Sequence, residues 1–162
     1  MPLPAGAVAP SFTLPDGEGA PRSLADLTRS GPALLAFFKI SCPTCQLAFP
    51  VIAELQRRYG DAVPVVAVSQ SKMGDTRPWL DRVGFAGPVL DDEAGHFEAS
   101  RSYGVEVVPT LVLVEDGRVE ATTEAWDREG MNGWARDLGG RSGRDTSPVS
   151  TTGDGRPAFK PG

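Results

Sequence analysis

The sequence predicts a single α/β domain in which helices cover both faces of a central mixed β-sheet. Apolar runs typical of buried strands alternate along the chain with amphipathic runs at helical spacing. Two strand-like runs joined by a tight turn, and then one more helical run, complete the order of an α/β sandwich. At 162 residues, the chain has the length of one domain and is long enough to bury a core.

The chain is predicted to begin with an extended lead-in over residues 1–10, followed by a β-hairpin. Residues 11–14 alternate between polar and apolar side chains, and Pro15-Asp16-Gly17 is a turn signal. Residues 22–24 are the expected return strand, and residues 24–27 a short helical turn.

Two buried strands and a long helix form the predicted centre of the domain. Ala33–Phe38 is apolar at every position, as expected for a strand covered on both faces, and Val63–Ser69 is a second strand of this kind. The helix after Cys42 is expected to run to about Tyr59. Pro50 falls inside it and is expected to kink it at a cost of ~3 kcal/mol, because the apolar spacing continues beyond that residue.

The second half of the domain is predicted to hold three more helices and three more strands. Thr76 is the predicted N-cap of a helix that ends near Gly84. The acidic run 91–93 is expected to cap a helix over residues 94–103, and Asp116-Gly117 is a hairpin turn signal. The remaining predicted elements are a strand at 88–90, hairpin strands at 110–114 and 119–123, and a helix at 128–138.

The composition changes at Gly139, and residues 139–162 are predicted to be a flexible tail on a domain of residues 1–138. Gly, Ser, Thr, Pro and scattered charges dominate this segment. Its few apolar side chains bury too little surface to offset the entropy of ordering it.

Charge and hydropathy exclude several classes of protein. The net charge of −5 argues against a nucleic-acid partner, which needs a concentrated basic face. No apolar run approaches the ~18 residues of a membrane span, and the N-terminus lacks the basic and apolar regions of a signal peptide. A cytoplasmic protein is therefore expected, although a leader or anchor removed from the chain would leave no trace.

The only two cysteines, Cys42 and Cys45, lie where the first buried strand meets the long helix. A Cys-x-x-Cys at this position is a redox signature, and so short a loop contributes little as a structural staple. Zinc would need two further ligands, whereas the only histidine, His96, stands beside acids in a predicted surface helix. We therefore expect neither a metal nor any other cofactor.

The two thiols are expected to have different roles. Cys42 lies at the start of the helix, where free N–H groups and the helix dipole favour a thiolate with a lowered pKa. It is the predicted nucleophile, and Cys45, one turn further in, is the predicted resolving thiol. Pro43 supports this placement, since proline is favoured in the first turn of a helix. A pair of inert buried cysteines is the alternative.

A family resemblance rests on these residues and on the later Val108-Pro109-Thr110. A strand, a Cys-x-x-Cys, a helix with proline five residues after the second cysteine, and Val-Pro-Thr before a hairpin resemble the thioredoxin-like superfamily. The opening Ala9–Gly17 and the segment around 70–90 resemble its redoxin branch. That branch joins the alkyl hydroperoxide reductase/thiol-specific antioxidant proteins and the thiol-disulfide oxidoreductases of cytochrome maturation.

The resemblance covers about residues 8–138 and implies a three-layer sandwich with an N-terminal β-hairpin. It also implies that Pro109 is a cis-proline packed against the active-site disulfide, and that Val108 offers backbone hydrogen bonds to a bound substrate. Pro43 and Thr44, between the cysteines, are assigned to the same substrate-binding surface.

The chain departs from thioredoxin-like proteins at two positions. Ser41 stands where they usually carry Trp before the first cysteine, and Ala36 stands where they carry a buried acid. The proton acceptor for Cys45 is therefore unaccounted for. Lys39 is a candidate for stabilising a thiolate electrostatically, its alternative being a solvated charge at the end of a strand.

The peroxidase signature of the relatives is absent. Peroxiredoxins place Pro and Thr seven and three residues before the peroxidatic cysteine. The corresponding residues are Phe38 and Cys42 for Cys45, and Leu35 and Lys39 for Cys42.

The leading hypothesis is therefore an enzyme, a thiol-disulfide oxidoreductase that uses a Cys-Pro-Thr-Cys couple. Its expected partners are a protein or low-molecular-weight thiol or disulfide and a thiol reductant. The alternatives are a thiol-dependent peroxidase with antioxidant activity and a non-enzymatic binding module of the same fold.

Overall fold

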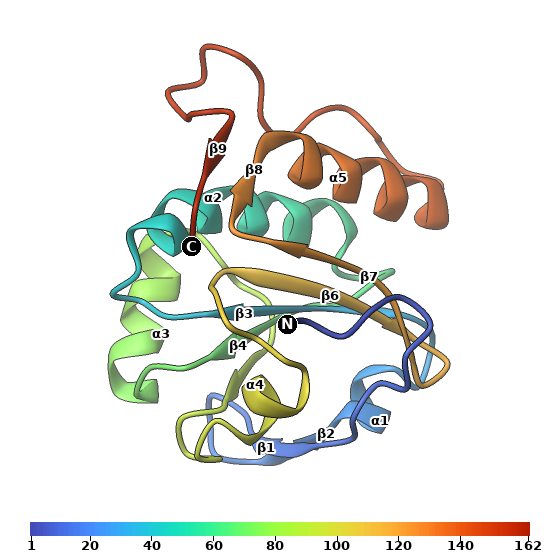
Figure 1. Cartoon of the computed structure of the whole chain (residues 1–162), viewed down its shortest axis with the longest axis vertical. Helices are drawn as coiled ribbons and strands as arrows, with labels where there is room; N and C mark the ends of the chain where they lie inside the picture. The colour runs from blue at the N-terminus through green and yellow to red at the C-terminus, as the bar shows by residue number, and fades with distance from the viewer.

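A five-stranded mixed sheet in the order β5-β4-β3-β6-β7 forms the centre of the computed structural model, which describes residues 1–162 (Figure 1). Strands β3, β4 and β5 are parallel, whereas β6 and β7 run antiparallel to their neighbours. The strands are β3 (Ala33–Phe38), β4 (Val65–Ser69), β5 (Val89–Asp91), β6 (Thr110–Glu115) and β7 (Arg118–Glu124). The order confirms the predicted α/β architecture with a mixed sheet.

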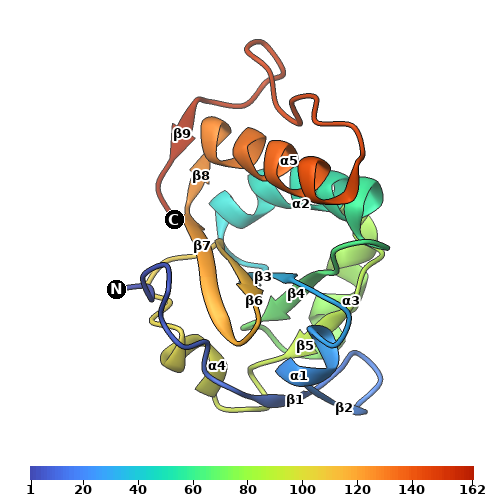
Figure 2. The same cartoon turned by 90° about the vertical axis from the view of Figure 1, so that its right-hand side faces the viewer.

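Two layers cover the sheet, one on each face (Figure 2). Every residue of β3 is buried because its side chains alternate between two apolar clusters, with Leu34 in one and Leu35 in the other. The first layer holds α2 (Pro43–Tyr59), α3 (Met73–Arg82) and α5 (Arg128–Ser142). The second holds the hairpin β1 (Thr13–Pro15) and β2 (Pro21–Ser23), with α1 (Leu24–Leu27) and α4 (Glu98–Ser102).

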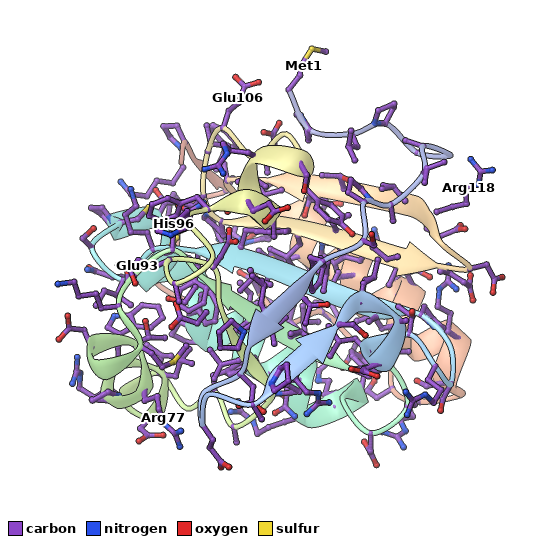
Figure 3. All side chains as sticks on the ribbon, turned by 90° about the horizontal axis from the view of Figure 1, so that it is seen from below. Met1, Arg77, Glu93, His96, Glu106 and Arg118 are labelled. Carbon is purple, nitrogen blue, oxygen red and sulfur yellow. The ribbon has the colours of Figure 1, made fainter.

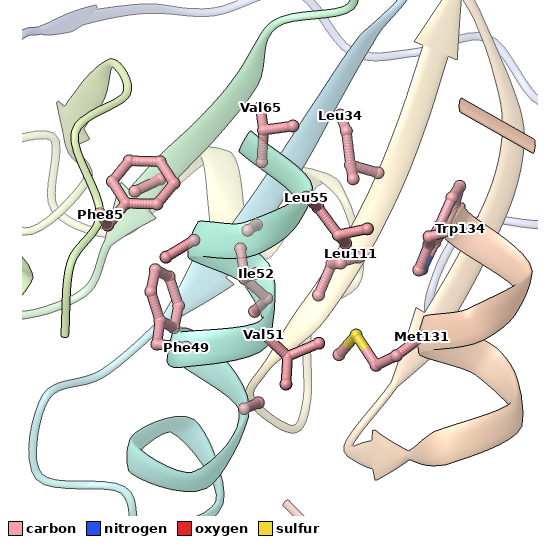
Figure 4. Close-up of a cluster of buried hydrophobic side chains, with 14 of the residues drawn as sticks. Leu34, Phe49, Val51, Ile52, Leu55, Val65, Phe85, Leu111, Met131 and Trp134 are labelled. Carbon is pink, nitrogen blue, oxygen red and sulfur yellow. The ribbon is translucent and has the colours of Figure 1, made fainter. Parts of the chain in front are cut away.

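The larger cluster lies between α2, the sheet and α5 (Figure 4). Leu55 of α2 meets Leu34 and Leu111 of the sheet there, with Trp134 of α5 beside them. Removing a buried leucine side chain of this kind typically costs about 2–5 kcal/mol. The cluster therefore fixes α2, and with it both cysteines, against the sheet.

Helix α2 follows the sequence-based prediction closely. Cys42 is its N-cap, Pro43 occupies its first turn, and Gly60 is its C-cap. The helix continues through Pro50 to Tyr59, as the apolar spacing predicted.

The start of α3 differs from the prediction. Lys72, and not Thr76, is the N-cap, so the helix begins at Met73. Thr76 is fully buried inside the helix, where its hydroxyl donates to the carbonyl of Lys72 at 2.9 Å and lies 2.7 Å from the hydroxyl of Ser69. A threonine inside a helix can donate its hydroxyl to the carbonyl four residues earlier in place of capping the helix. The sequence alone does not distinguish such a threonine from an N-cap.

The helix predicted over residues 94–103 is much shorter and forms only at Glu98–Ser102. His96 and Phe97 have left-handed backbone conformations, with φ of 54° and 60°, which a right-handed helix does not contain. His96 therefore lies in a loop, contrary to the prediction. Phe97, and not a residue of the acidic run, is the N-cap of α4, although the fully buried Asp92 carboxylate accepts the backbone N–H groups of Ala99 and Ser100 in the first turn.

The last helix also differs, since α5 extends to Ser142 and the predicted boundary at 138/139 falls inside it. After Gly143 the tail follows a defined course over α5 and α2 (Figure 1). It ends in a short strand, β9 (Phe159–Lys160), that pairs antiparallel with β8 (Trp126–Asp127). None of the helices is both long and apolar enough to cross a membrane.

Candidate active site

Cys42 lies at the junction of β3 and α2, at the carboxyl end of a central strand. Its sulfur accepts the backbone N–H of Cys45 at 3.4 Å, as an N-cap side chain does, and its thiol donates to the carbonyl of Val108 at 3.5 Å. The residue is half-buried, and both cysteines are free thiols. Open α/β sheets keep their sites at this edge, where the dipole of the following helix favours negative charge.

Cys45 lies one turn inside α2 and is completely buried in the larger apolar cluster. Burial raises the pKa of its thiol strongly, and the neighbouring Cys42 adds to the rise, while the backbone N–H of Lys39 acts in the opposite direction. No carboxylate contributes. Ala36, where relatives carry a buried acid, is packed in the same cluster.

The segment before β6 completes the site. The peptide bond between Val108 and Pro109 is cis, which confirms the prediction made for it. The Val108 carbonyl faces the Cys42 thiol, and the hydroxyl of Thr110 ties the segment down by donating to the carbonyl of Val107 at 2.7 Å. The site therefore joins two parts of the chain that are more than sixty residues apart. Substrate binding by Val108 and Pro109 stays a prediction.

The residues between and before the cysteines differ in exposure. Pro43 is exposed at the start of α2, and the side chain of Lys39 is exposed at the end of β3. Thr44 is only 2% exposed, and its hydroxyl donates to the carbonyl of Pro161 at 2.5 Å. Thr44 was expected to present an open surface to substrate. In the structure, Pro161 of the tail occupies that surface.

Sequence reasoning missed the tail as part of this site. Nothing in its composition signals that Pro161 reaches Thr44 of α2 or that Gly162 reaches Val108, because these contacts involve backbone groups that every residue carries.

No group of three or more His, Cys, Asp or Glu side chains lies close enough together to hold a metal ion. His96 is exposed on the loop that it shares with Glu93, near the start of α4 (Figure 3).

The chain is similar in sequence to known proteins. The model of the AhpC/TSA family matches residues 5–122. A thioredoxin-like protein of Haemophilus influenzae is 29% identical over 112 residues, which are 69% of this chain and 65% of that protein. The methylamine utilization protein MauD of Paracoccus denitrificans is 36% identical over 113 residues, which are 68% of this chain and 53% of that protein. The chain therefore spans less than two thirds of the length of these relatives.

Among solved structures, a protein of Chlorobium tepidum assigned as the thiol:disulfide interchange protein DsbE is similar to this chain. The two superpose with a TM-score of 0.74 at 29% identity, over 86% of this chain and 98% of that one. This agreement confirms the predicted thioredoxin-like fold.

Proposed function

The chain belongs to the AhpC/TSA family of thioredoxin-like oxidoreductases, and we propose that it exchanges thiols for disulfides through Cys42 and Cys45. The observation that carries the proposal is the unequal pair at the start of α2. One thiol is half-buried at the N-terminus of the helix, and the other is buried one turn behind it. The similarity to a DsbE assigned to thiol:disulfide interchange supports the same chemistry.

The reaction proceeds in two steps. The Cys42 thiolate attacks one sulfur of a substrate disulfide and forms a mixed disulfide, and the other substrate sulfur leaves as a thiolate that takes up a proton. Cys45 then loses its proton and attacks Cys42, which forms the Cys42–Cys45 disulfide and releases the second substrate thiol. Two electrons pass from the protein to the substrate, and a thiol reductant restores the pair.

Reduction of peroxides is the second candidate, because the same family includes peroxidases. The sequence around either cysteine lacks the Pro and Thr that support peroxide attack in those relatives, and Lys39 stands three residues before Cys42. Dithiol exchange is therefore the function that we propose.

Two assays on the purified protein test the proposal. Reduction of the interchain disulfides of insulin by dithiothreitol should be accelerated by the protein, whereas hydrogen peroxide consumption under the same donor should stay at the background rate. Acceleration of the peroxide reaction alone would favour the peroxidase. A protein that accelerates neither reaction, and whose mass after alkylation is the same with and without reductant, would be a binding module.

A further inference from the structure

The last four residues of the tail, Phe159–Gly162, which we call the tail end, bring Pro161 and Gly162 against Thr44 and Val108, beside Cys42. The Thr44 hydroxyl donates to the carbonyl of Pro161, and Gly162 lies so close to Val108 that an added Cβ would stand 2.5 Å from the Val108 carbonyl oxygen. The chain thus ends at the start of α2 in both views (Figures 1 and 2). The tail end occupies two of the positions assigned to substrate.

The tail end also forms one strand of a separate two-stranded sheet. It pairs with β8, so that Trp126 faces Lys160 and Asp127 faces Phe159. A hollow lined by Val107, Glu124, Ala125, Phe159, Pro161 and Gly162 lies next to it. An extended segment therefore rests on backbone groups beside the reactive thiol, in the position that an incoming polypeptide would need.

The preceding part of the tail is held differently, by hydrogen-bonding side chains that we call the anchor: the buried Trp126 and Asn132 and the partly buried Arg128. The amide of Asn132 donates to the carbonyl of Ser150 at 2.8 Å and accepts the N–H groups of Val149 and Ser150. Arg128 donates to the carbonyl of Arg156, and the Trp126 indole to that of Pro157.

The tail end lacks such fixation. Its strand is two residues long, Phe159 is 59% exposed, and one side-chain hydrogen bond, from Thr44, reaches it. Short exposed strands open locally far more easily than segments held by buried groups. The tail end is therefore able to leave while the anchor holds.

We infer that the tail end is an internal competitor of the substrate, which covers the surface formed by Thr44 and Val108 beside Cys42 and has to leave before a disulfide-bearing polypeptide reaches these residues. Because it is tethered next to its site, even a weak contact gives high occupancy. If only a fraction of the protein is open, the apparent KM equals the KM of the open form divided by that fraction, and kcat is unchanged. The substrate in this inference rests on the proposed function, but the closure does not.

The test removes Phe159–Gly162 and leaves the anchor intact. The rate at which a polyethylene-glycol maleimide modifies Cys42 should rise about fivefold, while the rate with the small reagent iodoacetamide changes little. The KM for insulin should fall by the same factor at unchanged kcat. A synthetic peptide of residues 156–162, added to the shortened protein, should restore slow modification. Thr152→Ala, in an exposed turn of the same tail, is the matched control.

A second variant guards against misfolding of the shortened protein. Gly162→Val in the full chain places a side chain against the Val108 carbonyl and should displace the tail end in the same way. Equal maleimide rates in the full chain and in both variants would overturn the closure. Faster modification at an unchanged KM would overturn the competitor role. Faster modification in a protein that reduces no disulfide would leave the closure standing and refute the proposed function instead.

Discussion

Access to solvent separates the two thiols of the active site. Cys42 is half-buried at the helix N-terminus, whereas Cys45 is enclosed by apolar side chains that raise its pKa. The proposed exchange requires a thiolate at each step, so we expect this difference to decide which sulfur starts the reaction and which step is slower.

Replacing each cysteine by serine should give opposite results. Cys42→Ser should abolish insulin reduction, because the buried Cys45 thiol does not reach a substrate disulfide. Cys45→Ser should still attack but not resolve, leaving substrate covalently bound to Cys42. Incubation with a cell extract and a non-reducing gel shows the trapped species. Adducts on Cys42→Ser in place of Cys45→Ser would reverse the roles.

The rate of the second step, the attack of Cys45 on the mixed disulfide, should keep rising as the pH increases above 7. Below the raised pKa of Cys45, its thiolate fraction grows about tenfold per pH unit, and no carboxylate is at hand to take the proton. A mixed disulfide of Cys42 with a chromogenic thiol should therefore release that thiol at a rate that climbs steadily from pH 6 to 9. A plateau near pH 7 would contradict this expectation.

Ala36→Asp is the matched variant for that measurement. A carboxylate at this position would enter the apolar cluster around Cys45 and supply the missing proton acceptor. Release at pH 7 should accelerate and the pH dependence should flatten, at a cost in stability, since a carboxyl group would be buried.

At the scale of elements, predictability follows the range of the interactions involved. Helix α2 and strand β3 were predicted with close bounds, because their apolar spacing and the flanking Pro43 and Gly60 are local signals. The lengths of α3 and α4 were not, because Thr76 and Asp92 bond to groups that the local pattern does not identify. The position of the cysteine pair was also predicted from a local signal. The contact between the tail and Thr44 was not, because it joins residues far apart in the sequence.

The anchored part of the tail should loosen in acid. Hydrogen bonds from the Ser150 hydroxyl and the N–H of Arg156 lower the pKa of Asp154 to about 2, from 3.8. Because the folded-state pKa is depressed, this contribution is fully present above about pH 4 and is lost as the pH falls toward 2. Arg156 lies over the Trp126 ring, so tryptophan fluorescence should report the change between pH 4 and 2.

Asp154→Asn should already show the loosened fluorescence at neutral pH. The exposed acid Asp75 makes a matched control, and Asp75→Asn should behave like the unchanged protein. Identical acid transitions in all three proteins would rule out Asp154 as the responsible group.

At the scale of the whole molecule, the tail joins both ends of α2. Arg58 and Tyr59 at its C-terminal end bind the carbonyls of Ser147 and Asp145, and Thr44 at its N-terminal end binds that of Pro161. The composition predicted a tail with little apolar surface to bury. A prediction from composition does not include hydrogen bonds between side chains of the domain and backbone carbonyls of the tail. Whether this segment is flexible stays a prediction, and stability measurements test it.

Deletions of different length should separate the stability contributed by the anchored part of the tail from that contributed by the tail end. Removing residues 143–162 deletes the hydrogen bonds that the Asn132 amide makes to Val149 and Ser150, each worth about 0.5–1.5 kcal/mol, and each kcal/mol lowers the thermal midpoint by about 2–4 °C. Removing only Phe159–Gly162 should leave the midpoint within about a degree. Calorimetry on the three proteins measures both effects. Equal midpoints would support a tail that contributes little, as the composition predicted.

The place where Gly162 lies also matters for protein engineering. Any polypeptide fused after this residue emerges beside Cys42, so an affinity tag at that end would alter the accessibility that alkylation experiments are meant to measure. The same position suits a reporter. A redox-sensitive fluorescent protein joined there by a short flexible linker would sit within reach of the thiol pair, and its colour would follow the oxidation state of the couple.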